Sequence, residues 1–248
     1  NNFIIPVLIA SIIPIINFFL VFFYLPETKP NNDLNKSKPI FKNPLKELFK
    51  VFKEEKIKKL SLAFFIYFIA FTGLTNILIF FLQESLNWTT KASSGTLVVV
   101  GIIAIIVQGG LIGPLVKQFG EMRLTLIGSG FILVACSLLI TAPKENATIN
   151  IYSAVSFLAV GAGLITPTLR ALISKKLDVD KQGSILSNLQ GLQSLGGVLG
   201  IAMAGRVYDS FGPKSPFIAG SVILLFMIYL IAEGKNNNSF NNQKSKEF

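Results

Sequence analysis

Seven long apolar runs, separated by polar segments, restrict the folds open to this chain. The first run covers residues 3–25, and the others cover residues 60–82, 95–116, 124–142, 151–169, 185–205 and 217–232. Each is close to the ~20 residues that an α-helix needs to cross a bilayer. The runs are continuous, whereas the strands of a membrane barrel would alternate apolar and polar residues. We therefore predict an all-α, polytopic membrane protein with seven transmembrane helices.

The composition agrees with this class and excludes several kinds of chemistry. Hydrophobic residues make up 51% of the chain, its mean hydropathy is +0.60, and it has 22 phenylalanines against 13 acidic residues. The single cysteine, Cys136, lies inside an apolar run, and the sequence contains no histidine. These counts exclude a disulfide within this chain, a cysteine metal site and an imidazole proton relay. We predict neither a metal site nor a cofactor.

The basic residues are unevenly distributed along the chain. If residues 26–59 are cytoplasmic, 19 of the 23 Lys and Arg residues fall on the cytoplasmic side, counting Arg170 at the inner end of its run. Because basic residues favour the cytoplasmic side of short loops, this count predicts an orientation. The segments predicted to be cytoplasmic are 26–59, 117–123, 175–181 and 235–248. With this placement, the net charge of +10 indicates contact with membrane lipid, and we expect no nucleic-acid partner.

Residues 26–59 are expected to have two parts. The segment holds ten lysines and five acids, and its Lys, Asn and Pro content up to Asn43 favours a flexible linker. Asn43 can then cap a helix starting at Pro44. One face of that helix would carry Leu45, Leu48, Phe49 and Phe52. Two interpretations stay open: a basic amphipathic helix on the inner membrane face, or a solvated charged run leading into the next span.

The stretch from Gly161 to Gly205 contains two apolar runs joined by a short charged hairpin. The second run carries Asn188, Gln190, Gln193 and several glycines. A helix in lipid that carries such amides presents one side to protein or to water. This pattern is typical of a helix that lines a transport path.

Four places in the sequence carry a resemblance to a known family. They are the LPET run that ends at Thr28; GPLVKQFGEMRL from Gly113 to Leu124; Gly161, Gly163, Pro167, Ala171 and Ser174 followed by Gln182-Gly183; and Phe211-Gly212 with Pro216-Phe217. Together they resemble the C-terminal half of a major facilitator superfamily transporter. Within that superfamily, they are similar to the twelve-span drug:proton antiporter branch, which includes the tetracycline-efflux pumps.

The resemblance implies a division of the chain. Residues 1–25 would be the sixth span, the last of an N-terminal bundle missing from this sequence, and residues 26–59 the central cytoplasmic loop. Residues 60–234 would form the C-terminal six-helix bundle, followed by a polar cytoplasmic tail at 235–248. We therefore expect the chain to be the C-terminal portion of a longer protein. Its expected partners are the missing N-terminal half, membrane lipid and a small-molecule substrate.

The resemblance also implies an activity. A protein of this family in the cell membrane, inner or plasma, would move a small organic solute by alternating access. Membership of the antiporter branch would imply efflux of an amphipathic compound coupled to protons.

The short connection between the runs at 95–116 and 124–142 holds four loop candidates. Gly113 and Gly120 flank a predicted loop of about six residues, where a tight reversal needs positive φ or close backbone approach. The cations Lys117 and Arg123 can interact there with helix C-termini and lipid phosphate. The family's first-half signature has an aspartate where Lys117 stands, so a charge-dipole latch does not carry over. A tight turn with cationic anchors is the alternative.

Two further residues are gate candidates. Pro167 removes a backbone hydrogen bond late in its helix and can act as a pivot, although prolines also occur in membrane helices without such a role. Arg170 lies near the inner boundary. It either closes a cytoplasmic gate by pairing with the missing half or is an anchor whose side chain snorkels to the interface.

Polar stripes on two helices indicate a solute path. At about 100° per residue, Thr72, Thr75, Asn76, Ile79 and Gln83 share one face, and so do Ser187, Gln190 and Ser194. Nearly opposite this second stripe is an apolar one that we expect to face lipid: Ile185, Leu189, Leu192, Leu199 and Met203. We predict that Asn76, Gln190 and Ser194 line the path, with Gln108 as a further candidate. Gly197 and Gly200 are predicted to be helix-packing residues. The alternative is that these polar groups only hydrogen-bond between helices.

The predicted lining offers amides and hydroxyls but no fixed charge, which suits a neutral or weakly charged amphiphile. No carboxylate lies in the middle of a predicted span. We therefore expect any proton-coupling site in the missing half. Glu84, at an outer end, is the one coupling candidate in this sequence, and a solvated loop residue is its alternative role.

A seven-span receptor or photoreceptor with an outside N-terminus is the alternative function. Two features oppose a receptor. The longest predicted loop separates the first apolar run from the other six, and no lysine lies in the middle of a predicted span, where it could form a retinal Schiff base. Because the sequence has no constellation of nucleophile, base and metal ligand, we do not expect an enzyme. Five further apolar spans upstream in the full coding sequence would favour the transporter.

Overall fold

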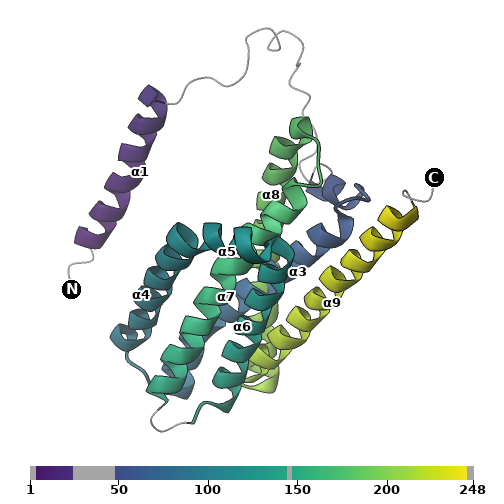
Figure 1. The fold of residues 1–248 in the computed structure, drawn as a ribbon. Helices are drawn as coiled ribbons and strands as arrows, with labels where there is room; N and C mark the ends of the chain where they lie inside the picture. Colours follow the sequence, from purple (N-terminus) through teal and green to yellow (C-terminus); the bar gives the residue numbers. More distant parts are fainter. Residues whose placement is uncertain (1–3, 25–47, 144–146, 245–248) are drawn as a thin grey trace. The chain divides into compact units, whose positions relative to one another are not determined.

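The computed structural model describes residues 4–24, 48–143 and 147–244, and every regular element in these ranges is a helix. The chain divides into two units, Asn1–Lys42 and Asn43–Phe248. The first unit contains α1 (Ile4–Tyr24), an apolar helix with Pro14 inside it (Figure 1). The second unit contains all the other helices and is described by itself below.

The second unit is built from long helices. Its elements are the 3₁₀ turn η2 (Lys50–Phe52), α3 (Lys58–Phe80), the π-helical turn η3 (Phe81–Ser85), α4 (Thr90–Ile106), the π-helical turn η4 (Val107–Leu111), α5 (Ile112–Phe119), α6 (Glu121–Thr141), α7 (Thr148–Ser174), α8 (Val179–Phe211) and α9 (Ser215–Lys244). The π turns connect helices without a break, so α3 continues through η3, and α4 through η4 into α5. A side-chain cap begins α4, because the Thr89 hydroxyl accepts a hydrogen bond from Ala92 N at 3.3 Å.

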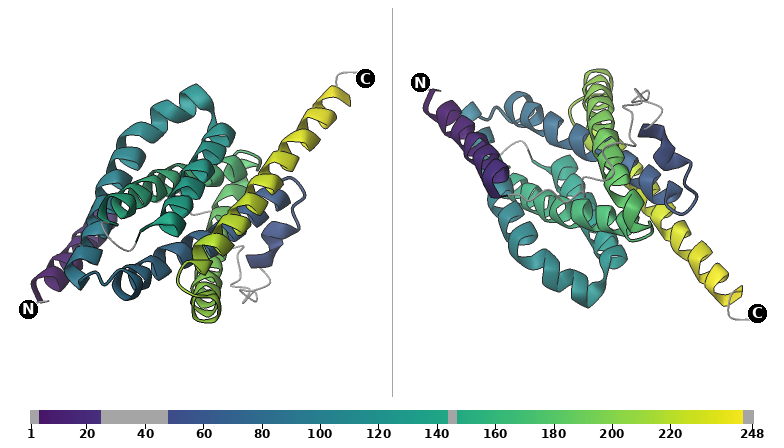
Figure 2. Two further views of the ribbon diagram at one scale, coloured as in Figure 1. Left: turned by 90° about the horizontal axis from the view of Figure 1, so that it is seen from below. Right: turned by 90° about the horizontal axis from the view of Figure 1, so that it is seen from above.

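Helix α7 lies in the interior of this bundle. It packs along α6 on one side and α4 on another, and it also touches α3 and α8. Helix α3 in turn packs along α8 and α9 (Figure 2). The core is apolar and aromatic: Phe64, Tyr67 and Phe81 are almost fully buried, and the Phe81 ring meets Phe217 of α9 edge-on at 5.1 Å. An ion pair between Lys59 and Glu233, 2.6 Å long, joins α3 to α9.

Facing glycines allow the closest helix crossings. A Cβ added at Gly161 of α7 would lie 2.6 Å from the Gly128 carbonyl oxygen of α6. A Cβ added at Gly73 of α3 would lie 2.8 Å from the Gly200 carbonyl oxygen of α8. Small residues let helix backbones approach closely in a membrane, where apolar side chains gain little by leaving lipid. The α6–α7 and α3–α8 contacts are therefore dense.

Five helical rods are long and apolar enough to cross a membrane in the described part of the chain. They are Lys58–Ser85, Thr90–Phe119, Glu121–Thr141, Thr148–Ser174 and Ser215–Glu233. The 33 residues of α8 are long enough, but amides, serines and glycines replace many of its apolar side chains. In α1, the apolar stretch Ala10–Tyr24 is shorter. The chain is a multi-pass membrane protein, and the count of seven spans stays a prediction.

The predicted loop between Gly113 and Gly120 is wrong in its extent. Residues 112–119 form α5, so Gly113 is helical, and a Cβ there would meet nothing within 4 Å. Only Gly120 separates α5 from α6, with φ +76°. A second reversal of this kind occurs at Gly212, with φ +90°, between α8 and α9. No longer loop is needed between α5 and α6, because one residue in this conformation suffices to end one helix and begin the next.

The segment before α3 packs against the bundle. The predicted helix start at Asn43 and Pro44 lies outside the described residues. Beyond it, Val51 is fully buried, and Leu48 and Phe52 pack on the bundle core. Neither open interpretation of this segment included such packing. Leu48, Val51 and Phe52 therefore have protein partners, whereas Phe49 of the predicted apolar face is 45% exposed, and contact of this face with the membrane stays a prediction.

Candidate functional site

A polar cluster joins α7 to α8. The Nη2 atom of Arg170, one turn before the end of α7, donates hydrogen bonds to the amide oxygens of Gln190, at 2.8 Å, and Gln193. The two glutamines stand three residues apart on α8, so they share one side of that helix. The sequence predicted Gln190 as a path residue and Arg170 as a gate or anchor. The structure brings these two residues together.

The surroundings hold the Arg170 guanidinium in place. Its Cζ lies 5.8 Å from the centre of the fully buried Phe64 ring of α3, which is within the range of a cation–π contact. Its Nε is buried without a hydrogen-bond partner. Among the residues that the structure describes, no acid pairs with Arg170. The cluster is therefore a half-buried cation whose hydrogen-bond acceptors are neutral.

The other predicted path residues are exposed on the bundle. The Ser194 hydroxyl, one turn beyond Gln190 on α8, donates to the Gln190 carbonyl oxygen at 3.2 Å. The Asn76 amide donates to the Thr72 carbonyl oxygen of its own helix at 2.9 Å. Gln108 is exposed in the π turn η4. Asn76 and Ser194 thus make only local bonds, and their side chains have further hydrogen-bonding capacity.

The apolar stripe predicted to face lipid on α8 divides into two parts. Leu199 and Met203 are 40% and 49% exposed, but Leu189 and Leu192 are fully buried in the core. The expectation of lipid contact is wrong for the latter two, because η2 and α3 cover that part of α8. Helical periodicity gives the face of a residue but not the neighbour that covers it.

The two packing glycines predicted on α8 differ in their surroundings. A Cβ at Gly200 would collide with the Ile69 carbonyl oxygen of α3. A Cβ at Gly197 would lie 3.5 Å from the Thr72 methyl group, which is ordinary contact. The preceding residue, Gly196, is more closely packed than Gly197: a Cβ added there would lie 3.1 Å from the Phe65 carbonyl oxygen of α3.

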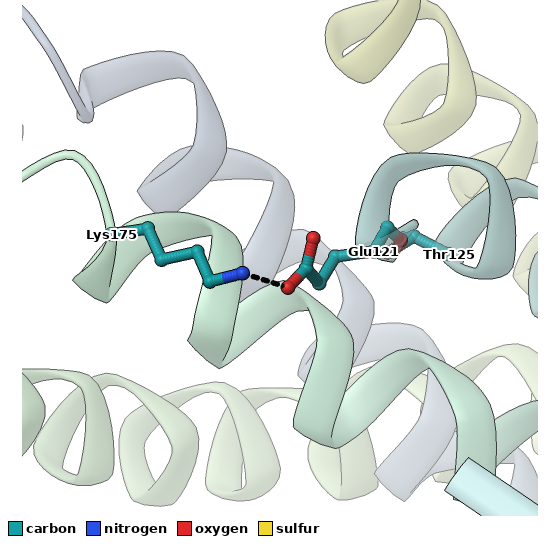
Figure 3. Close-up of polar contacts among 3 residues, drawn as sticks. All are labelled: Glu121, Thr125 and Lys175. Carbon is teal, nitrogen blue, oxygen red and sulfur yellow. Dashed lines mark hydrogen bonds and ion pairs between the residues drawn. The ribbon is translucent and has the colours of Figure 1, made fainter. Parts of the chain in front are cut away.

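The gate and loop candidates lie at one end of the bundle. Pro167 is half-buried inside a continuous α7. Lys117 and Arg123 are exposed on either side of Gly120. An ion pair that the sequence did not predict lies beside them: Lys175 reaches from the end of α7 to the Glu121 carboxylate at the start of α6 (Figure 3). One turn inward, the Thr125 and Thr168 hydroxyls hydrogen-bond at 2.9 Å and are buried.

An acid at the opposite end of the bundle has a partner on another helix. Glu84 in η3 accepts a hydrogen bond from the Tyr208 hydroxyl of α8 at 2.9 Å.

In the described part of the chain, no three His, Cys, Asp or Glu residues gather in a way that could hold a metal ion.

Two hollows of the bundle are lined by residues other than the predicted path residues Asn76, Gln108, Gln190 and Ser194. One hollow, of about 470 Å³, lies between α4, α6 and α7. It is lined by Val99, Phe131, Tyr152, Ser153, Ser156, Phe157 and Val160. A smaller one, of about 40 Å³, lies where α3, α8 and α9 meet. On α8, Gln190 and Ser194 are exposed on the surface of this unit.

Comparison with curated proteins gives relatives of two kinds. The tetracycline resistance protein of class C from Escherichia coli is 26% identical over 52% of this chain and 32% of its own length. The class H protein from Pasteurella multocida is 27% identical over 54% of this chain and 32% of its own length. The human hippocampus abundant transcript-like protein 1 is 21% identical over 91% of this chain and 49% of its own length. The chain spans about a third to a half of the length of these relatives.

The fold has a neighbour among solved structures. The human organic anion transporter MFSD10 (TETRAN) superposes with a TM-score of 0.64 at 20% identity, over 76% of this chain and 46% of that protein. At this identity, the likeness concerns the fold alone. The model of the Major Facilitator Superfamily matches residues 2–201, which is most of the sequence. On this match, the chain belongs to the major facilitator superfamily.

Proposed function

We propose that this chain supplies one of the two bundles of a secondary transporter that moves a small organic solute across the cell membrane by alternating access. The six helical rods from α3 to α9 form that bundle, and the solute path runs between it and a second bundle. Because a path between bundles needs both, residues 1–248 alone are not expected to transport.

The observation that carries the proposal is the contrast between two surfaces of the bundle. On α9, Val222, Leu225 and Phe226 are more than half exposed, as suits a surface in lipid. On α8, Gln190 and Ser194 are exposed beside Arg170. Polar groups at membrane depth are costly in lipid and face protein or a water-filled path. We therefore assign Gln190 and Ser194, with Asn76 of α3 and Gln108 of η4, to the path.

Efflux driven by protons is the mode that we propose. Its support is the similarity to tetracycline resistance proteins. Three acids with described partners, Glu84, Glu121 and Glu233, lie at the ends of the candidate membrane spans rather than in their middles. The coupling carboxylate is therefore assigned to the other bundle. The alternative of a seven-span receptor has no support from the family match.

The test uses the full-length protein, with its N-terminal half, in inside-out membrane vesicles. An imposed pH gradient, acidic inside, is expected to drive accumulation of at least one amphipathic probe from a panel that includes tetracycline. A protonophore should abolish this accumulation. Vesicles containing only residues 1–248 serve as the matched control and should accumulate nothing. Equal accumulation by that control would contradict the proposal, as would full-length vesicles that move no member of the panel.

A further inference from the structure

The polar cluster on α7 and α8 contains an uncompensated positive charge. Arg170 donates only to the amide oxygens of Gln190 and Gln193, which accept hydrogen bonds but carry no charge. The acids with ion-pair partners in the described ranges are bound elsewhere: Glu121 to Lys175, Glu233 to Lys59 and Glu55 to Lys58. A half-buried cation in a membrane protein is costly unless an anion accompanies it.

The hydrogen bonding of the guanidinium is also incomplete. Both glutamines use Nη2, while Nε is buried with no acceptor. An unsatisfied buried donor costs free energy, so it needs an explanation. The Phe64 ring beneath the guanidinium restricts its orientation. The group is therefore pre-oriented, desolvated on one side and short of an acceptor.

The cluster is open on its α8 side. Gln190 is exposed, and the exposed Ser194 hydroxyl lies one turn away. An incoming anion can therefore displace the neutral Gln190 amide from Arg170, while Gln193 continues to hold Nη2. A carboxylate fits this role best, because its two oxygens match the fork of the guanidinium and form charge-assisted bonds.

We propose that Arg170, held by Gln193 and Phe64 and shielded by Gln190, binds a carboxylate group carried by the transported solute. This inference rests on the proposed function and names its substrate class: an amphiphile with an anionic end and an apolar body. It differs from the expectation of a lining without fixed charge, because it adds Arg170 to the lining. The sequence placed Arg170 only at the inner boundary, whereas the structure places its guanidinium against the predicted path residue Gln190.

The test uses full-length protein in proteoliposomes, with Cys136→Ala and Ser194→Cys. The rate at which an impermeant maleimide labels position 194 is measured with increasing 1-naphthylacetate or its uncharged analogue 1-naphthylacetamide. The two probes differ only in their charged end. Naphthylacetate is expected to slow labelling with a half-protecting concentration roughly tenfold lower than that of the amide, since one charge-assisted interaction is lost. Equal concentrations, or no protection by either probe, would overturn the proposal.

Substitutions of the cation provide the controls. Arg170→Gln should remove the preference for naphthylacetate, and Arg170→Lys should retain part of it because the charge remains without the planar fork. Arg206→Gln, a matched charge removal at an exposed position of α8, should leave it unchanged. A preference that persists in Arg170→Gln would overturn the proposal. If Arg170→Gln does not accumulate as folded protein, the wild-type comparison of the two probes still decides.

A carboxylate side chain of the other bundle could bind Arg170 in place of the solute. In that case, naphthylacetate would not protect position 194, and only Arg170→Gln would change the labelling rate. This result would contradict binding of the solute. Transport by the same proteoliposomes separates the two proposals. Solute movement without any carboxylate preference refutes the inference alone. Protection by naphthylacetate in a protein that moves no solute refutes the proposed function.

Discussion

Helix α7 takes part in two contacts of opposite character. Against α6 it is closely packed: Gly161 meets Gly128, and the Thr168 hydroxyl meets Thr125, both out of reach of solvent. Against α8 it is sparsely packed, and its contact there is the polar one from Arg170 to Gln190.

The two contacts of α7 therefore have different expected roles: the α6 contact holds the bundle together, and the α8 contact is the proposed solute site. Glycines and paired hydroxyls join helices in a membrane at little cost, since they satisfy each other or let backbones approach. An arginine with amides on an exposed helix face does not join helices in this way, and we have proposed that the cluster at Arg170 lies on the solute path. We therefore expect substitutions on the α6 side to change stability, and substitutions on the α8 side to change solute affinity.

The largest expected effect is at the α6–α7 crossing. In Gly161→Ala, the new Cβ lies too close to the Gly128 carbonyl oxygen, a backbone atom that cannot turn away. We expect a loss of about 1–3 kcal/mol in stability, as for overpacked cores. The control is Gly130→Ala on α6, where a Cβ meets nothing within 4 Å. Thermal unfolding of the full-length protein in detergent measures both; equal melting temperatures would contradict the close crossing.

On the α8 side, Gln190→Ala should change the half-saturating solute concentration about 3- to 10-fold, the size of one hydrogen bond. For a carboxylate solute this concentration should fall, because the solute no longer has to displace the Gln190 amide from Arg170. Its folded yield should stay near that of the wild type, because Gln190 is exposed. Leu192→Ala, on the buried side of the same helix, is the contrast: it should lower the folded yield by opening a cavity. A Gln190→Ala protein with unchanged affinity for every transported solute would remove this residue from the path.

A smaller effect is expected at the buried hydroxyl pair. Each hydroxyl has one proton and also lies within hydrogen-bonding distance of a carbonyl of its own helix, so the bond between Thr125 and Thr168 competes with these local bonds. A double-mutant cycle with Thr125→Val and Thr168→Val should give a coupling of about 0.6 kcal/mol, the average for such bonds in membrane proteins. Strictly additive melting shifts would show that the two hydroxyls do not stabilise the α6–α7 contact together.

The smallest effect is expected at the ion pair shown in Figure 3. The Lys175 side chain is 67% exposed and that of Glu121 is 15% exposed. Solvent and salt therefore screen the pair, and Glu121→Gln should cost only about 0.2–0.5 kcal/mol in stability. The cost should shrink when unfolding is repeated at high salt. A cost that does not respond to salt would indicate a role for Glu121 other than this pairing.

Much of the fold followed from pattern alone. The apolar runs located the helices of the bundle, and glycine marked the tight connection at Gly120. The ends of the helices did not follow, because helices extend beyond their apolar runs into polar residues, as α8 does at both ends. Gly113 was predicted to flank a loop for a different reason: glycine permits a turn, but a continuous helix can also contain it.

The candidate site was predictable in its polar residues but not in its contacts. Helical periodicity placed Gln190 and Ser194 on one face. It could not show that Arg170, 20 residues earlier, reaches Gln190, nor that Lys175 meets Glu121 across 54 residues. It also could not show that the η2 segment and α3 cover Leu189 and Leu192. Such relations depend on how helices cross, which the period of a single helix does not contain.

The measurement that tests the central claim most directly compares two adjacent positions of α8 at one depth. Gln190→Cys and Leu189→Cys are introduced separately into the full-length protein with Cys136→Ala and treated with an impermeant thiol reagent. If the exposed face of α8 lines the solute path, the cysteine at 190 reacts, a transported solute slows that reaction, and the cysteine at 189 stays unreactive because that position is fully buried. A reactive, solute-protected position 189 beside an unreactive position 190 would contradict the account.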